Sequence, residues 1–230
     1  MINFEKSCIA ITVLLIACVV VSCKTNTGDE HNTTADSLAA DSLKIDSLSL
    51  EKPELNFQEV LDSVYQNNAK SVYQALMTGS KRFTRDSAFV YRSTESIPDS
   101  LSRKKPIFFL TDIDLPQSPD RIFDLRKSMF MQLSSPASLL DPKDVAVMEY
   151  AVMYSGTKVI VVLANNNSKM IGAACDNVQT GSFGSIRKEL EKAMADAQEF
   201  ADRSSTNKNY VNTIAQNQAR ISRDQIFSYS

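Results

Sequence analysis

Short apolar runs alternate along this chain with longer segments in which apolar residues recur at helical spacing. Residues 106–110 and 159–163 form uninterrupted apolar runs, and the second is almost wholly β-branched. Such runs are typical of buried strands in a parallel sheet. A looser alternation over residues 128–133 predicts a further strand between them.

Helical periodicity marks the segments around these runs, at residues 57–76, 145–152, 185–201 and 210–219. Before the second of them, Asp141 is placed to cap a helix, and Pro142 suits its first turn. A strand, a helix and a strand in this order favour a right-handed crossover between parallel strands. We therefore expect an α/β fold, with three αβα layers around a central, mainly parallel sheet of about four strands.

The polar loop 164–169 follows the apolar run 159–163 and leads into a helix of small residues. In open α/β sheets, ligands bind beyond the carboxyl ends of the strands, close to the free N–H groups of the next helix. This loop is therefore the expected position of a functional site.

The N-terminal apolar run, residues 9–21, is short for a membrane span and is followed by Ser22 and Cys23. This pattern predicts a signal peptide, and the small residue before a cysteine resembles the bacterial lipobox. Cys23 would then carry lipid as the first residue of the mature chain. An ordinary signal peptide or an uncleaved anchor is the alternative interpretation.

These observations divide the chain into a lipoprotein signal peptide (1–22), a flexible tether (23–52) and one globular domain (53–230). The tether is rich in Thr, Asn, Asp and Ser and repeats Asp-Ser-Leu from Asp36, Asp41 and Asp46. A short recognition repeat for a partner is its alternative role. We expect a lipid-anchored protein of the bacterial cell envelope, on the periplasmic side or at the outer-membrane surface.

Charge and cysteine content exclude several functions. The net charge of −2, without a basic stripe, argues against a nucleic-acid partner. Of the four cysteines, Cys8 and Cys18 would leave with the signal peptide and Cys23 would be lipidated. Cys175 alone remains, so neither an intramolecular disulfide nor a cysteine metal cluster is expected, and we expect it to be buried as a small apolar residue. His31, the only histidine, lies in the tether and is a poor catalytic candidate.

Three fragments resemble β-class carbonic anhydrases. Residues 76–83, Leu-Met-Thr-Gly-Ser-Lys-Arg-Phe, are similar to the family signature Leu-x-x-Gly-Asn-x-Arg-Phe. Ile-Phe-Asp at 122–124 often follows the strand that ends in Cys-x-Asp-x-Arg, and 148–163 is similar to the segment before Gly-His-x-x-Cys-Gly. The resemblance implies a β-carbonic-anhydrase-like fold and a homodimer. Gly79 is expected to end its helix in a left-handed conformation.

The family's zinc ligands are replaced in this chain. By the resemblance, Asp112 and Ser168 stand at the two zinc cysteines, and Asn165 stands at the histidine. Asp114 matches the family's aspartate, whereas Pro116 replaces its arginine. Zinc favours thiolate and imidazole ligands, and zinc-bound water supplies the hydroxide for catalysis. We therefore expect no zinc or other cofactor, and a catalytically inactive carbonic-anhydrase-like binding or structural module. An active zinc-dependent carbonate dehydratase is the alternative.

Other interpretations of these loop residues stay open. They are simple loop residues if Asn167 or Ser168 only caps the following helix. Their oxygen atoms also suit Ca²⁺ or Mg²⁺. Helix N–H groups with Lys169 would suit an anion or carboxylate ligand. The sequence does not name the ligand. Family members commonly continue past the position of Ser230 into a further strand, so the resemblance also implies a sheet edge left exposed or covered by another segment.

Overall fold

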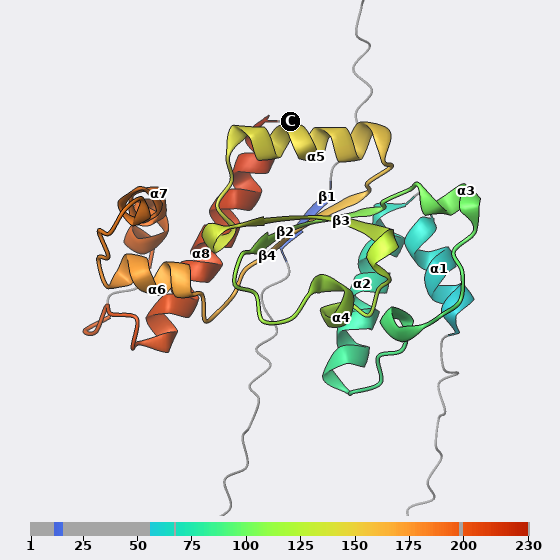
Figure 1. Ribbon diagram of the computed structural model, residues 1–230, viewed down its shortest axis with the longest axis horizontal. Coiled ribbons are helices and arrows are strands. Elements are labelled where there is room, and N and C mark those ends of the chain that lie inside the picture. The colour runs from blue at the N-terminus through green and yellow to red at the C-terminus, as the bar shows by residue number, and fades with distance from the viewer. Residues whose placement is uncertain (1–11, 16–55, 67, 198–199, 230) are drawn as a thin grey trace, which may run out of the picture.

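A parallel sheet forms the centre of the fold (Figure 1). The computed structural model describes residues 12–15, 56–66, 68–197 and 200–229. The sheet has the order β1-β4-β2-β3, and all three neighbouring pairs are parallel. Its strands are β1 (Thr12–Leu15), β2 (Ile107–Asp112), β3 (Phe130–Ser135) and β4 (Val159–Leu163). The predicted α/β class with a parallel sheet is confirmed.

Strand β1 covers the edge of β4, with Thr12 opposite Val159 and Leu15 opposite Val162. It falls inside the segment that the sequence predicts to be a signal peptide. After cleavage before Cys23, the sheet would keep the order β4-β2-β3. Cys23 and His31 lie outside the described residues.

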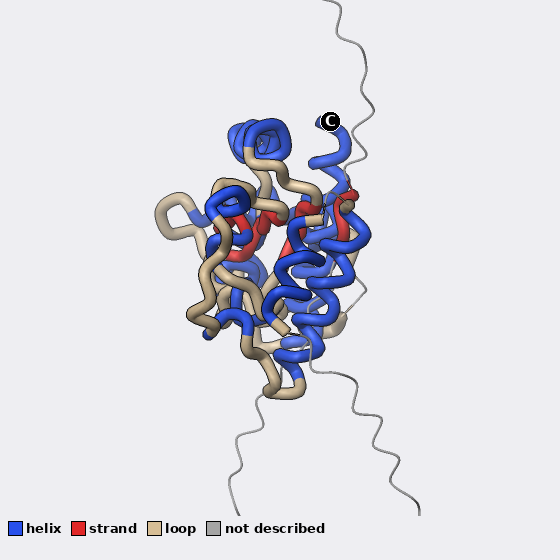
Figure 2. The backbone as a smooth tube through the Cα atoms, turned by 90° about the vertical axis from the view of Figure 1, so that its right-hand side faces the viewer, coloured by secondary structure: helices blue, strands red, loops and turns tan. Residues whose placement is uncertain are grey.

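Helices cover both faces of the sheet (Figures 1 and 2). Phe108, Leu110, Ile160 and Val162 belong to a core formed with α5 to α8, whereas Phe109 and Val161 belong to a second core with α1 and α2. Strand side chains alternate between the two faces, which explains why residues 107–110 of β2 and all of β4 are apolar. The helices are α1 (Phe57–Tyr65), α2 (Ala69–Thr84), α3 (Asp99–Ser102), α4 (Pro119–Ile122), α5 (Pro142–Tyr154), α6 (Lys169–Cys175), α7 (Phe183–Ala195) and α8 (Lys208–Tyr229).

Helix α5 confirms its sequence signals in detail. Asp141 and Asp144 form a capping box, Pro142 occupies the first turn, and Gly156 follows the end of the helix with a φ of +72°. The later helices have different limits from those expected. Helix α7 ends at Ala195, and Phe200, counted in its periodicity, instead packs from the following loop with its ring 5.4 Å from that of Tyr210.

The prediction that Gly79 ends its helix is wrong. Helix α2 continues to Thr84, so Gly79 lies in its interior. A Cβ atom at this position would lie 1.8 Å from the carbonyl oxygen of Phe123. The glycine therefore allows α2 to approach the end of α4 closely, rather than supplying a left-handed backbone.

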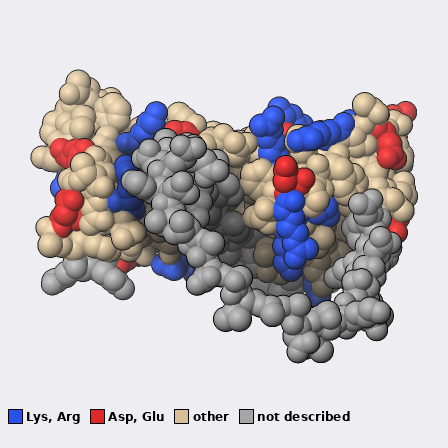
Figure 3. Space-filling model, turned by 90° about the horizontal axis from the view of Figure 1, so that it is seen from below, with Lys and Arg blue, Asp and Glu red and all other residues tan. Residues whose placement is uncertain are grey.

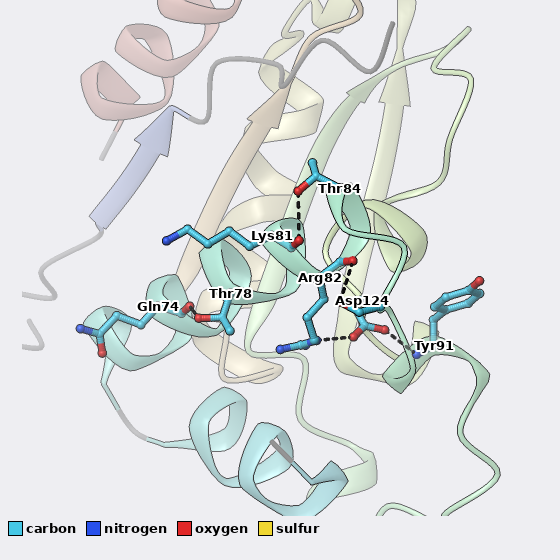
Figure 4. Close-up of polar contacts among 8 residues, drawn as sticks. Gln74, Thr78, Lys81, Arg82, Thr84, Tyr91 and Asp124 are labelled. Atoms are coloured by element: carbon cyan, nitrogen blue, oxygen red, sulfur yellow. Dashed lines mark hydrogen bonds and ion pairs between the residues drawn. The ribbon is translucent and has the colours of Figure 1, made fainter. Parts of the chain in front are cut away.

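The same region holds a buried ion pair (Figure 4). The Nε atom of Arg82 donates to Oδ2 of Asp124 at 2.6 Å, and Oδ1 of Asp124 accepts from the Tyr91 amide at 3.2 Å. Asp124 is fully buried. The fragments 76–83 and 122–124, which are separate in the sequence, thus contact each other through an ion pair and through the Gly79 approach.

Candidate functional site

The loops that follow β2 and β4 meet at the carboxyl edge of the sheet. Asp112 ends β2, and Asp114 lies in the loop after it. Nδ2 of Asn165, after β4, donates to the backbone oxygen of Asp114 at 3.0 Å and to Oδ1 of its carboxylate at 2.9 Å. The sequence-predicted positions 112, 114, 165 and 168 therefore gather in one cluster, here called the loop cluster.

The Asp114 carboxylate lies at the N-terminus of α6. Its Oδ2 atom accepts from the Lys169 amide, the first of this helix, at 2.5 Å. Free N–H groups and the helix dipole stabilise a negative charge at this position. The chain thus supplies its own carboxylate to the N–H group that the anion-binding interpretation assigns to an external ligand.

Asn165 and Ser168 accept hydrogen bonds from backbone amides of the same loop and of α6. Ser168 caps α6, because its Oγ accepts from the Ile171 amide at 3.3 Å. Oδ1 of Asn165 accepts from the Asn167 amide at 3.0 Å. Both Asn165 and Ser168 are buried. Of the two predicted capping candidates, Ser168 is the one that caps the helix.

Asp112 is the most perturbed carboxyl group of the cluster. Only 2% of it is exposed, and its Oδ1 accepts from the Ala137 amide at 3.0 Å. Its Oδ2 has no hydrogen-bond partner in the described part of the chain. Burial raises the pKa of Asp112 to about 6, and the charge of Asp114 adds to this, against the lowering effect of the Ser168 hydroxyl. The protonated acid is therefore well populated near pH 6.

Ala137 and Ser138, shortly after β3, lie beside the loop cluster. Both have left-handed backbone, with φ of 53° and 55°. Besides the Ala137 amide bond to Asp112, the Ser138 hydroxyl donates to the Leu163 carbonyl at 3.2 Å, and the Ser138 carbonyl accepts from Ser222 of α8 at 2.8 Å. These bonds hold a strained backbone. Sequence reasoning missed both residues, since neither Ala nor Ser signals a positive φ.

A small cavity of about 100 Å³ opens beside the cluster. Its wall is mainly apolar and comes from α2, the loop after β2, α4 and the end of β4. Pro116 is part of this wall, whereas Asp112 is not. The volume corresponds to about three water molecules. The residues that line it are Ser80, Phe83, Leu115, Pro116, Gln117, Ile122, Leu163, Ala164, Asn165 and Asn166.

The donor set of the loop cluster does not fit zinc. It consists of two carboxyl groups, an amide and a hydroxyl, without the thiolate or imidazole that zinc favours. Asp112, Asp114, Asn165 and Ser168 each already accept a bond from a backbone or side-chain N–H group. Across the described residues, no group of three or more His, Cys, Asp or Glu side chains is arranged to hold a metal. Most polar atoms of the cluster are therefore occupied by internal hydrogen bonds, and Oδ2 of Asp112 is the exception named above.

Cys175 is the last residue of α6 and is half-buried rather than buried. Burial raises the pKa of its thiol to about 11, and the neighbouring Asp176 charge adds to the rise. The reactive thiolate is therefore scarce at neutral pH.

Two comparisons with known proteins were without a match. No model of a known protein family matches the chain, and a search of curated proteins finds no significant match.

Within the ranges that the structure describes, none of the helices is both long and apolar enough to cross a bilayer.

Proposed function

We propose that this chain is a lipid-anchored, carbonic-anhydrase-like domain without hydratase activity, which serves as a binding or structural module in the bacterial cell envelope. One observation carries the proposal: the Asp114 carboxylate bonds to Asn165 and to the Lys169 amide. Internal hydrogen bonds thus fill the place where the resemblance locates the zinc site. A carboxylate, an amide and a helix N–H group that already bond to one another favour a structural role over metal-dependent chemistry.

The retained and the altered motif residues divide by role, which supports the proposal. Gly79 and Arg82, from the first motif, contact Phe123 and Asp124 of the Ile-Phe-Asp fragment. These residues hold the fold together. The altered residues are those to which the resemblance assigns metal binding. A chain selected for its framework rather than for catalysis would keep the first group and lose the second.

No side chain of the loop cluster is placed to take over the catalytic role that zinc has in the family. Hydration of CO₂ at neutral pH requires an activated water or hydroxide. Asp112, with a pKa raised to about 6, is the group nearest to a general base in this cluster. It is buried and does not line the cavity, so its carboxylate is not placed to activate a water molecule there.

Two further parts of the proposal concern assembly and location. Lipid on Cys23 would hold the domain at the membrane, on the periplasmic side or at the outer-membrane surface. The resemblance implies a homodimer. Mass spectrometry of the chain isolated from cells, for an acylated Cys23 at its N-terminus, and sedimentation of the purified protein test these two parts.

The central test combines metal analysis with a CO₂ hydration assay. The mature-length chain, purified after incubation with zinc, is expected to hold no stoichiometric metal and to leave the hydration rate at the background of the buffer. A triple variant, Asp112→Cys with Asn165→His and Ser168→Cys, restores the ligand types and is expected to bind about one zinc ion per chain.

A matched control carries the same residue types at scattered exposed positions, as Asp99→Cys, Asn209→His and Ser182→Cys. It is expected to bind no stoichiometric zinc, because its ligands do not converge. Stoichiometric zinc with turnover in the unmodified chain would reject the proposal in favour of a carbonate dehydratase. A folded triple variant without zinc would reject the assignment of positions 112, 165 and 168 to the metal site.

A further inference from the structure

Helix α5 presents an apolar face to solvent as well as to the core. Val145, Met148 and Ala151 form its buried face. The helix forms the outermost layer above the sheet in Figure 1. A helix that is apolar on both sides is typically covered on both sides. The outward residues are Val147, Tyr150, Met153 and Tyr154, and the rings of the two tyrosines lie 5.3 Å apart.

A basic segment borders the C-terminal end of this face. The Lys105 amide donates to the Ser155 carbonyl at 2.7 Å, and the Thr157 hydroxyl donates to the Lys105 carbonyl, also at 2.7 Å. These bonds place the run Arg103-Lys104-Lys105 beside the end of α5. Arg103 and Lys104 are exposed. Both residues therefore lie close in the chain to Lys105, which bonds to the end of α5 that carries Tyr154.

The local charge balance is positive at this border. Lys158 lies next to the segment, since its amide donates to the Pro106 carbonyl at 2.8 Å. The exposed acids nearby are Glu149 on α5 and Asp99 on α3. On the opposite side of the molecule, seen in Figure 3, basic and acidic side chains lie next to each other.

We propose that the outward face of α5, together with Arg103 and Lys104, docks the domain on an anionic phospholipid surface. Tyrosine rings suit the membrane interface because one end is apolar and the other forms hydrogen bonds with water. Exposed Lys and Arg next to them are attracted by anionic headgroups. The inference rests on the lipid anchor of the proposed function, which keeps the domain at a bilayer.

The length of the N-terminal segment permits this contact. Between Cys23 and Asn56 lie roughly 32 residues, which span at most about 110 Å when fully extended. This exceeds the roughly 40 Å expected across a domain of this size. The anchor therefore does not prevent any face of the domain from reaching the membrane.

Vesicle sedimentation tests the docking face without the anchor. The described members of both cores lie between Phe57 and Ile226, so a chain that begins at residue 24 keeps them and carries no lipid. It is mixed with vesicles of phosphatidylcholine alone, or with about one third phosphatidylglycerol. We expect binding to the anionic vesicles, about tenfold weaker to the neutral ones, and further loss of binding at high salt.

Two variants and two matched controls locate the contact. Tyr150→Ser with Tyr154→Ser is expected to lower binding at least tenfold on both vesicles. Arg103→Gln with Lys104→Gln is expected to lower it about tenfold on anionic vesicles only. The controls change an exposed aromatic residue, as Phe183→Ser, and two exposed basic residues, as Lys188→Gln with Lys192→Gln, on α7, and should bind like the unmodified chain.

Equal binding of all these proteins, or no binding to anionic vesicles, would overturn the inference. It would also be overturned if the tyrosine variant turned a dimer into a monomer without vesicles, because the face would then be a protein interface. Lipidation of Cys23 is measured separately on the processed chain from cells. Failure of the anchor and failure of the docking face are therefore distinguishable.

Discussion

At the residue scale, the fold stabilises the protonated form of Asp112 over its carboxylate. Burial and the nearby Asp114 raise its pKa from 3.8 to about 6. The folded chain therefore binds this proton more tightly than the unfolded chain does. The resulting stabilisation is full below about pH 4 and is lost as the pH rises to about 6. Its upper limit is about 3 kcal/mol.

This pH dependence predicts that Asp112→Asn makes the protein more stable at pH 7. The amide oxygen still accepts from the Ala137 amide, and the cost of burying a charge disappears. We expect a gain of up to about 3 kcal/mol at pH 7 that shrinks toward zero near pH 4. Urea unfolding of both proteins at the two pH values measures it, and an equal gap at both would contradict the assignment.

Asp176 provides a control in which stability should change with pH in the opposite direction. The Ser205 side chain and amide lower the pKa of this exposed carboxyl group. Its stabilising contribution is therefore present above its unfolded pKa and is lost as the pH falls. Asp176→Asn should make the protein less stable at pH 7, and the difference should close in acid.

Gly79 gives the second prediction at this scale. Gly79→Ala would place a methyl group 1.8 Å from the Phe123 carbonyl oxygen, so α2 and α4 must separate. We expect a loss of about 3 kcal/mol in the free energy of unfolding. In Gly184→Ala, inside α7, the new Cβ meets only the flexible end of Gln179 at 3.0 Å, and the change should be neutral or stabilising. Similar losses in both variants would exclude the close approach as the cause.

At the scale of the elements, local sequence signals were sufficient to predict several strands and helices. Features that depend on packing between distant segments could not be predicted from the sequence. Strands β2 and β4 follow from apolar runs, and α5 follows from its Asp-Pro cap, which are signals within a few residues. The role of Gly79 depends on Phe123, which is distant in the sequence. In the loop cluster, the resemblance anticipated which positions meet. It did not reveal the Asp114 bond to the Lys169 amide or the left-handed Ala137 and Ser138.

The ion pair between Arg82 and Asp124 joins α2 to the segment after α4, and it gives a prediction at the same scale. The side chain of Arg82 is 13% exposed and that of Asp124 is 0% exposed. Arg82→Gln leaves Asp124 buried without its counter-charge, and should cost about 3 kcal/mol of stability. Arg223 and Asp224 form a pair with 32% and 64% exposure, so Arg223→Gln should cost less than about 0.5 kcal/mol. Thermal and urea unfolding compare the two. An equal loss of stability in the two variants would mean that the buried ion pair contributes no more than the exposed one.

At the scale of the whole molecule, two cores enclose a sheet in which β2 is central. Among the side chains that the structure describes, both cores are built from residues between Phe57 and Ile226, and β1 is an edge strand. If the first 22 residues are a cleaved leader, the remaining chain must fold without β1. Strand β4 then becomes an edge of apolar, β-branched residues, the kind of edge that favours pairing with other chains.

A chain that begins at residue 24 tests this consequence. We expect it to unfold in one cooperative transition, with the slowest amide exchange in β2, because β2 keeps neighbours on both sides. In β4, the amides that face the vacated edge should exchange faster than in an uncleaved Cys23→Ala chain. A shortened chain without cooperative unfolding would mean that β1 is an integral part of the sheet, and the signal-peptide interpretation of residues 1–22 would then be wrong.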